Sequence, residues 1–290
     1  MPCFLDVRLS STGGDLAAEV AINQGTSIAN YQSLDKNQLI QNIRGQNVLI
    51  ATHGFNVNRA DGIASLSNWA KLLQLPSPSI FIGLLWPGDS IWAHGLDYPN
   101  EPRVADDAGA LVAPFLDANF TGAASISLAS HSLGARVLLS TISKMNSPVR
   151  RAIIMAGAID DNCLDTQFQA AAAKVGAISV LASKKDEVLA ALYPLGNFFG
   201  GILDQGHPWW HSALGRDGPS LPQPGHFRAP FEIPDNWDFG HGDYLEIASP
   251  PPPSILIPTD VPPNGSPEPA NGATGWQSAW TAALASTRFR

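Results

Sequence analysis

The chain has 290 residues, of which 44% are hydrophobic and 14% are charged, and its formal net charge is -8. The apolar content excludes a fully disordered chain, and the length fits one large domain. The longest basic clusters are the pairs Arg150-Arg151 and Lys184-Lys185. The chain therefore lacks the positive field that binding to nucleic acid requires, and we expect no nucleic-acid partner.

The cysteines and the N-terminal segment exclude two further classes of protein. Cys3 and Cys163 are too few for a disulfide scaffold and show no metal-ligand spacing, so we expect two isolated thiols. Residues 1–8 lack the pattern of a secretion signal, and no apolar run reaches the length of about 18 residues that a membrane span needs. We therefore expect a cytoplasmic chain that is not an integral membrane protein.

Short apolar runs recur along the chain after a strand-like segment at residues 4–9. These runs occupy residues 48–51, 80–85, 126–129, 152–155 and 177–181. Between them, residues 60–73, 105–118 and 133–144 carry apolar residues at the three- and four-residue spacing typical of helices. Buried strands that alternate with helices predict an α/β fold, with a mostly parallel sheet flanked by helices on both faces.

The composition changes towards the C-terminus. Residues 196–224 are rich in Gly, Pro, His and Trp, which predicts an irregular covering segment, and residues 227–233 predict a last strand. We therefore expect one domain over residues 1–248, beginning with a strand prelude at 1–46. A Pro-rich extension follows at 249–290 and ends in a short amphipathic segment at 276–289.

The sequence Ser-His-Ser-Leu-Gly at residues 130–134 lies between a predicted strand and a predicted helix. This is the setting of a nucleophile elbow, in which a tight turn exposes a serine hydroxyl and needs small residues on either side. The spacing predicts Ser132 as a nucleophile, with Ser130 in place of the usual first glycine. The alternative is a serine-rich start of an ordinary helix.

A second loop follows the predicted strand at 48–51 and reads Thr-His-Gly-Phe-Asn over residues 52–56. In this type of fold, one amide from such a loop and one from the residue after the nucleophile form the oxyanion hole. We expect these donors to be the backbone amides of Phe55 and Leu133. His53 is expected to brace the loop and to take no proton.

A serine nucleophile needs a base, and the base needs an acid that fixes its tautomer. Asp186 follows the predicted strand at 177–181, and His241 lies later in a loop with two glycines. The order Ser132, Asp186, His241 agrees with that of α/β hydrolases. Asp160 and Asp161 also follow a strand and remain competing acids.

The other histidines have less definite roles. His131 adjoins the nucleophile and is expected to project away from it. The remaining candidates for the pocket wall are His94, His207, His211 and His226. No predicted helix carries a pair of histidines at a zinc-like spacing, so we expect neither a metal nor another cofactor.

Several of these motifs together resemble a bacterial α/β-hydrolase family long catalogued as a domain of unknown function. The family carries HGFN and AHSMG-type motifs, a WPS stretch, a Tyr and an Asp before the next helix, and an S-x-x-D segment. The corresponding residues here are 53–56, 129–134, 86–90, Tyr98, Asp106 and 183–189. The resemblance covers about residues 47–245 and implies a serine esterase-like or lipase-like enzyme with the triad Ser132, Asp186 and His241. Gly88 and Leu133 depart from the family pattern.

Tryptophans at several loop positions suggest an apolar pocket. Trp86 follows the predicted strand at 80–85, and Trp209 and Trp210 lie in the covering segment. We expect these three side chains to bind the substrate, because aromatic rings at one edge of a sheet form apolar walls.

The sequence therefore predicts a serine hydrolase that cleaves carboxylic esters through an acyl-enzyme, with a small-molecule ester as substrate and a preference for apolar acyl groups. The alternatives are a lipase or thioesterase on the same fold, or a non-catalytic interaction module with a tryptophan-rich face. The natural substrate, the acyl length and the oligomeric state do not follow from the sequence.

Overall fold

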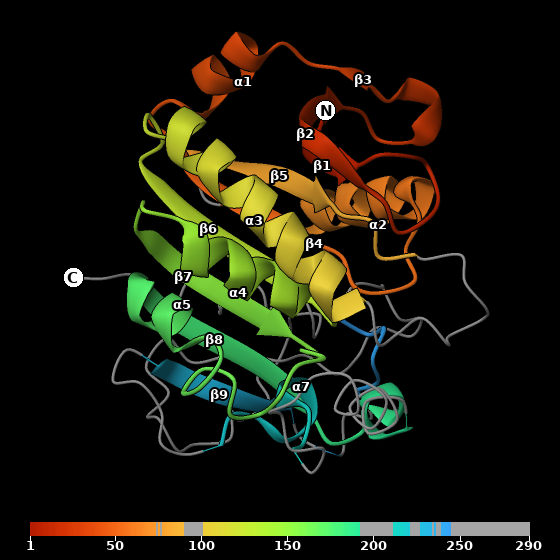
Figure 1. The fold of residues 1–290 in the computed structure, drawn as a ribbon, viewed down its shortest axis with the longest axis vertical. Helices are drawn as coiled ribbons and strands as arrows, with labels where there is room; N and C mark the ends of the chain where they lie inside the picture. The colour runs from red at the N-terminus through yellow and green to blue at the C-terminus, as the bar shows by residue number, and fades with distance from the viewer. Residues whose placement is uncertain are drawn as a thin grey trace.

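The computed structural model describes residues 1–73, 75, 77–89, 101–191, 211–220, 227–233, 235 and 239–244. The C-terminal extension at 249–290 lies outside these residues, as do Trp209 and Trp210. Figure 1 shows the described elements arranged as one central sheet with helices packed against it.

Within the described residues, the strands form one 9-stranded sheet in the order β3-β2-β1-β5-β4-β6-β7-β8-β9. The strands are β1 (Cys3–Arg8), β2 (Leu16–Gln24), β3 (Gln32–Ser33), β4 (Asn47–Thr52), β5 (Ser79–Leu85), β6 (Ser125–His131), β7 (Val149–Met155), β8 (Val175–Ser183) and β9 (Phe227–Ile233). The pairs β1–β2 and β2–β3 are antiparallel, and every other neighbouring pair is parallel.

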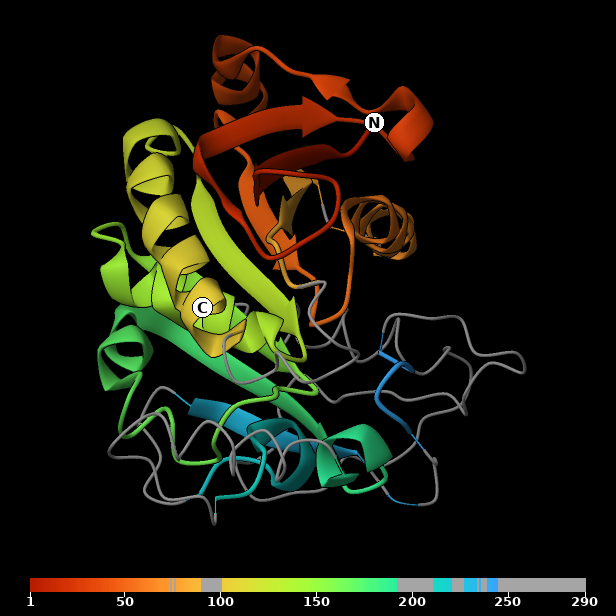
Figure 2. The same cartoon turned by 45° about the vertical axis from the view of Figure 1, so that its right-hand side comes forward.

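Helices cover both faces of this sheet. They are α1 (Lys36–Ile43), α2 (Arg59–Leu72), α3 (Glu101–Asn119), α4 (Gly134–Lys144), α5 (Gln169–Lys174) and α7 (Leu214–Asp217), with a short 3-10 helix at Ile28–Asn30. Helices α3, α4 and α5 lie on one face of the sheet and α2 lies on the other, as both Figure 1 and Figure 2 show. The predicted α/β fold, with its mostly parallel sheet covered on both sides, is confirmed.

The parallel strands agree with the predicted apolar runs to within a few residues. Strands β4, β6 and β7 are almost entirely buried, which explains why their sequences lack an apolar-polar alternation. The N-terminal prelude holds more structure than we expected, because β2, β3 and α1 follow β1. Strand β2 is mostly half-buried or exposed and includes polar residues, so it carries only a weak pattern. The covering segment also holds the short helix α7.

The parallel arrangement brings the carboxyl ends of β4, β6, β7 and β8 to one edge of the sheet. Ligands of open α/β sheets bind in the crevice outside such an edge. Thr52, His131, Met155 and Ser183 are the last residues of these strands. The loops that carry Phe55, Leu133, Asp160 and Asp186 begin at these residues. Cys3 and Cys163 are both buried and free, as expected.

Candidate active site

Ser132 occupies a sharp turn between β6 and α4. Its φ angle is 53°, in the left-handed region that residues other than glycine seldom adopt. Three backbone hydrogen bonds hold this conformation. The Ser132 amide donates to the carbonyl of Met155 at 2.9 Å, and the Ser132 carbonyl accepts from the amides of Ala135 at 3.0 Å and Ala158 at 3.2 Å. A strained serine that is held this firmly is the geometry predicted for a nucleophile elbow.

Two glycines allow the loop after β4 to lie directly against this turn. A Cβ atom on Gly54 would stand 2.7 Å from the Cβ of Ser132, and one on Gly134 would stand 2.4 Å from the carbonyl oxygen of His53. Both distances are too short for real atoms, so only glycine permits this contact. The loop of Phe55 and the turn of Leu133 are therefore neighbours, as an oxyanion hole built from their amides requires.

Asp186 and His241 meet across 55 residues of sequence. The Nδ1 of His241 lies 2.7 Å from Oδ2 of Asp186, and the amide of Leu189 donates to Oδ1 at 2.9 Å. The Asp186 side chain is completely buried, whereas that of His241 is 16% exposed. An ionised carboxylate only accepts hydrogen bonds, so Nδ1 carries the ring proton. The Nε2 of His241 makes no hydrogen bond to a described residue, which leaves it available as a base.

The loop that carries His241 is fixed by hydrogen bonds on both sides of the histidine. Oδ2 of Asp243 accepts from the amide of Gly240 at 2.6 Å and closes the turn. The hydroxyl of Ser183, at the end of β8, donates to the carbonyl of Phe239 at 2.6 Å. Ser183 is the last residue of β8 and Asp186 follows it by three residues, so the segment after β8 holds both the candidate acid and the loop of the candidate base. The sequence analysis included Ser183 only as the first residue of the S-x-x-D segment and assigned no role to Asp243.

His131 does not project away from the nucleophile, so that expectation is wrong. Its Nε2 lies 2.7 Å from the carbonyl oxygen of His241, and the two imidazole centroids are 4.8 Å apart. Burial, followed by the nearby His241, lowers the pKa of His131 from 6.5 to about 3, so its ring is neutral. His131 is the last residue of β6, and its side chain lines the same cavity as Ser132.

His53 braces its loop, as expected, and Trp86 is its main partner. The Nδ1 of His53 donates to the carbonyl of Gly54 at 2.9 Å, and its Nε2 accepts from the backbone amide of Trp86 at 3.4 Å. The indole of Trp86 donates to the carbonyl of His53 at 2.9 Å and stacks on its ring. Burial lowers the pKa of His53 to about 3, which keeps this ring neutral too. Trp86 is fully buried and does not line the cavity, so its expected contact with substrate is wrong.

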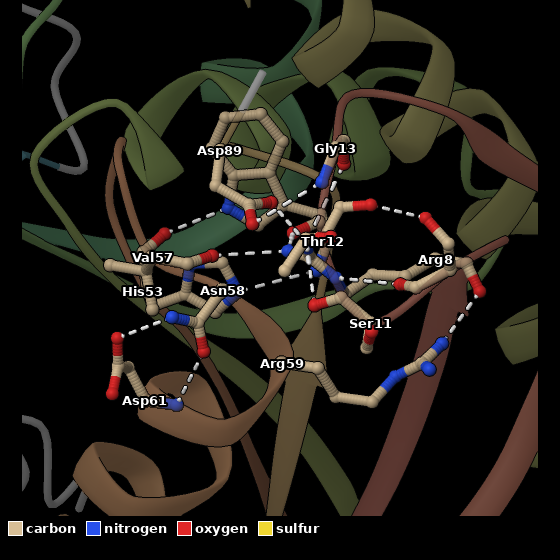
Figure 3. Close-up of polar contacts among 12 residues, drawn as sticks. Arg8, Ser11, Thr12, Gly13, His53, Val57, Asn58, Arg59, Asp61 and Asp89 are labelled. Carbon is tan, nitrogen blue, oxygen red and sulfur yellow. Dashed lines mark hydrogen bonds and ion pairs between the residues drawn. The ribbon is translucent and has the colours of Figure 1, made fainter. Parts of the chain in front are cut away.

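Arg8, at the end of β1, holds the loops after β4 and β5 together (Figure 3). Its guanidinium donates to the carbonyl of Val57 at 3.0 Å and to the carbonyl of Trp86 at 2.8 Å, and it forms an ion pair with Asp89. The Arg8 side chain is completely buried. A buried charge is costly unless it is paired and hydrogen-bonded, and here these contacts join the loops after β4 and β5. The sequence contains a signal for this role that the sequence analysis did not use, namely an arginine at the end of an apolar strand.

Asp161 and His211 form a second acid-histidine pair at the end of β7. The Nδ1 of His211 lies 2.9 Å from Oδ1 of Asp161, and its Nε2 lies 3.1 Å from the side-chain amide of Asn162. Both ring nitrogens are therefore occupied, and neither residue lines the cavity beside Ser132. Of the competing acids, Asp186 is the one that contacts His241. The other candidates His94, His207 and His226 lie outside the described residues.

A cavity of about 690 Å³ opens beside Ser132 and His241. This volume is within the range of small-molecule sites. Its described wall comes from the loop after β4, from helix α2 and from the histidine loop. It consists of Thr26, His53, Gly54, Phe55, Val57, Asp61, Ala64, Ser65, Ser67, Asn68, Lys71, His131, Ser132, His241 and Gly242. The cavity joins the candidate nucleophile and the candidate base.

Neither a metal-ligand cluster nor a membrane-spanning helix is found in the described part of the chain. No group of three or more His, Cys, Asp or Glu side chains there could hold a metal ion. No helix among those residues is long and apolar enough to span a membrane.

Comparisons with solved structures give only distant similarities. Among solved structures, the esterase PE8 is 16% identical, with 68% of this chain and 86% of that chain covered and a TM-score of 0.37. A hyperthermophilic esterase from the archaeon Pyrobaculum calidifontis is 13% identical, with 61% and 69% covered and a TM-score of 0.33. Dipeptidyl peptidase 4 from Porphyromonas gingivalis is 11% identical, with 66% and 30% covered and a TM-score of 0.33. Similarity at this level identifies no substrate, and no curated protein matches the chain.

A family model gives the more definite result. The model described as "Alpha/beta hydrolase of unknown function (DUF900)" matches residues 30–197, which is more than half of the chain. Ser132 and Asp186 lie within the matched segment, whereas His241 lies beyond it. The resemblance read from the HGFN and SHSLG motifs is confirmed, and the chain belongs to this family of α/β hydrolases of unknown function.

Proposed function

We propose that the chain is a serine hydrolase that cleaves carboxylic esters through an acyl-enzyme. One observation carries the proposal. Ser132 in its strained turn and His241 line the same cavity, and His241 is bonded through Nδ1 to the buried Asp186 at 2.7 Å. A nucleophile, a base and an acid that fixes the tautomer of the base are the three parts of a serine hydrolase.

The proposed reaction begins when Oγ of Ser132 attacks the ester carbonyl carbon while Nε2 of His241 takes the hydroxyl proton. The carbonyl electron pair moves onto oxygen, where the amides of Phe55 and Leu133 stabilise the negative charge. The bond to the alcohol then breaks, and His241 returns its proton to the leaving oxygen. Water repeats the sequence on the acyl-enzyme and releases the acid. Throughout, Asp186 stabilises the imidazolium form of His241.

The apolar acyl preference remains a prediction. Trp209 and Trp210, on which it mainly rests, lie outside the described residues, and Trp86 does not reach the cavity. The described wall offers both apolar side chains, such as Phe55 and Val57, and polar ones, such as Asn68. A panel of p-nitrophenyl esters of graded acyl length measures the preference directly. A maximum kcat/KM for the shortest acyl group would contradict it.

A fluorophosphonate probe and the variant Ser132→Ala test the proposal itself. We expect the wild-type protein to be labelled and to hydrolyse p-nitrophenyl esters. The variant should lose both properties because no nucleophile remains, with about 10³-fold or greater loss of kcat. Its melting temperature should show that it is folded. Labelling or turnover retained by the pure variant would refute the assignment of Ser132, and a wild-type protein without labelling or turnover would favour a non-catalytic module.

A further inference from the structure

His131 lies between the two loops that the proposed chemistry requires. On one side its Nε2 is 2.7 Å from the carbonyl oxygen of His241. On the other side its Nδ1 is 3.3 Å from the point where a Cβ atom would project from Gly54. The residue is only 7% exposed, and it directly precedes the nucleophile Ser132. It therefore contacts the histidine loop and the predicted oxyanion loop at once.

The hydrogen bond to His241 has one direction. A carbonyl oxygen only accepts, so Nε2 of His131 carries the proton and donates it. The backbone of His241 is thus held by His131, while its ring is held through Nδ1 by Asp186. These two anchors act at opposite ends of the same residue. Together they determine where the free Nε2 of His241 lies.

We propose that His131 is a positioning residue, whose Nε2–H holds the backbone of His241 so that the base stays aligned with Ser132. This inference rests on the proposed ester hydrolysis and adds a residue that lies outside the predicted triad. His131 takes no proton from the substrate in this role. It acts only through the placement of His241, so its loss should reduce kcat more than it changes KM.

A neutral ring suits this position better than a cationic side chain would. His241 becomes an imidazolium during the reaction, and the two ring centroids are only 4.8 Å apart. A positive charge at residue 131 would oppose that change. Burial keeps the pKa of His131 near 3, so the ring donates its hydrogen bond without a charge at neutral pH. Tyr244, whose ring centroid is 6.1 Å away, packs on the same imidazole and contributes to its burial.

A pair of matched variants separates hydrogen bonding from packing. In His131→Gln, the side-chain amide can place an N–H near the position of Nε2, whereas His131→Met has a similar length but no donor. We expect the methionine variant to lose about 10- to 100-fold in kcat with little change in KM, and the glutamine variant to retain most of its kcat. The control His211→Gln alters a histidine outside the cavity and should leave both constants unchanged. Equal kcat values for the two variants at residue 131 would overturn the proposal.

The tautomer of His131 in the wild-type protein gives a test that needs no variant. Nitrogen-15 NMR should show a neutral ring protonated at Nε2 at neutral pH. Protonation at Nδ1 would exclude the hydrogen bond to His241 and would overturn the proposal even if both variants failed to fold. A wild-type protein with the expected tautomer but without ester turnover would contradict the proposed function instead, so the two failures are distinguishable.

Discussion

At the scale of single residues, the site depends on which ring nitrogen carries a proton. Asp186 accepts from Nδ1 of His241, His131 donates from Nε2, and His53 donates from Nδ1. Each tautomer follows from the neighbouring oxygen, which in every case can only accept. Three histidines of one protein thus have three different environments, and His241 is the one that pairs with a carboxylate and keeps its Nε2 free of hydrogen bonds to the described residues.

The change Asp186→Asn tests the most important of these contacts. An amide at residue 186 can donate to the histidine, which favours the wrong tautomer and leaves the imidazolium unstabilised. We expect kcat for ester hydrolysis to fall by roughly 10⁴-fold, as in serine proteases. Steady-state kinetics on p-nitrophenyl acetate would measure it. The control is Asp160→Asn, which should change kcat far less, and the opposite ranking would move the acid to the end of β7.

For single residues, the sequence predicted a role only where that role belongs to a local sequence motif. Ser132 was identified because the elbow is a run of five residues between a strand and a helix. The contact between His131 and His241 spans 110 residues, and no local pattern records it. It depends on where β6 and the loop of residues 239–244 come together in the folded chain.

At the scale of elements, the site is a set of loops at one sheet edge that must hold their relative positions. Arg8 joins the ends of β1, β4 and β5 by donating to the carbonyls of Val57 and Trp86. The amide of Asn56 also donates to the carbonyl of Gly88 at 2.6 Å. The predicted oxyanion loop is therefore fixed by contacts with residues outside the loop itself, and Figure 3 shows the polar contacts among Arg8, Val57, Asp89 and their neighbours.

The variant Arg8→Lys tests whether this network supports catalysis. Lysine keeps the charge beside Asp89 but cannot reach the same set of carbonyl oxygens as a guanidinium. We expect a loss of up to about 10²-fold in kcat, because the amide of Phe55 would shift from its place. The affinity for a boronic acid, which mimics the tetrahedral intermediate, should fall in parallel while KM changes little.

The control for that experiment is Arg150→Lys. Arg150 donates to Asn47 at the opposite edge of the sheet, so its replacement should affect neither kcat nor binding of the boronic acid. A variant of Arg8 that melts at a lower temperature but binds the boronic acid normally would show that Arg8 only stabilises the fold.

At the scale of the whole molecule, two buried neutral histidines make stability depend on pH. Burial lowers the pKa values of His53 and His131 from 6.5 to about 3. In the unfolded chain both side chains take up protons near pH 6.5, whereas in the folded chain they do so only near pH 3. The unfolded state binds more protons between these values, so the free energy of unfolding decreases as the pH falls through this window.

We expect each histidine to contribute a slope of about 1.4 kcal/mol per pH unit within that window. Denaturant unfolding of the wild-type protein and of His131→Gln, measured at several values between about pH 6 and pH 4, isolates one of the two contributions. The free energy of unfolding of the variant should fall less steeply with decreasing pH, by about 1.4 kcal/mol per pH unit. Identical slopes would mean that His131 is protonated in the folded protein.

The sequence by itself determined the class of fold and the order of the main elements. Continuous apolar runs such as residues 126–129 and the helical spacing at 133–144 predicted β6 and α4 because buried strands and amphipathic helices impose these local periods. It also predicted the candidate site as a set of residue types, with Ser132, Asp186 and His241 in the order of an α/β hydrolase.

Only the tertiary structure decided how those residues meet. The elements β2, β3 and α1, the inward turn of His131, the burial of Trp86 and the contacts of Arg8 are all results of packing. The physical reason is that periodicity is a property of neighbouring residues. The distance between Asp186 and His241, or between Arg8 and Trp86, is set instead by how the nine described strands assemble into one sheet and bring their loops together.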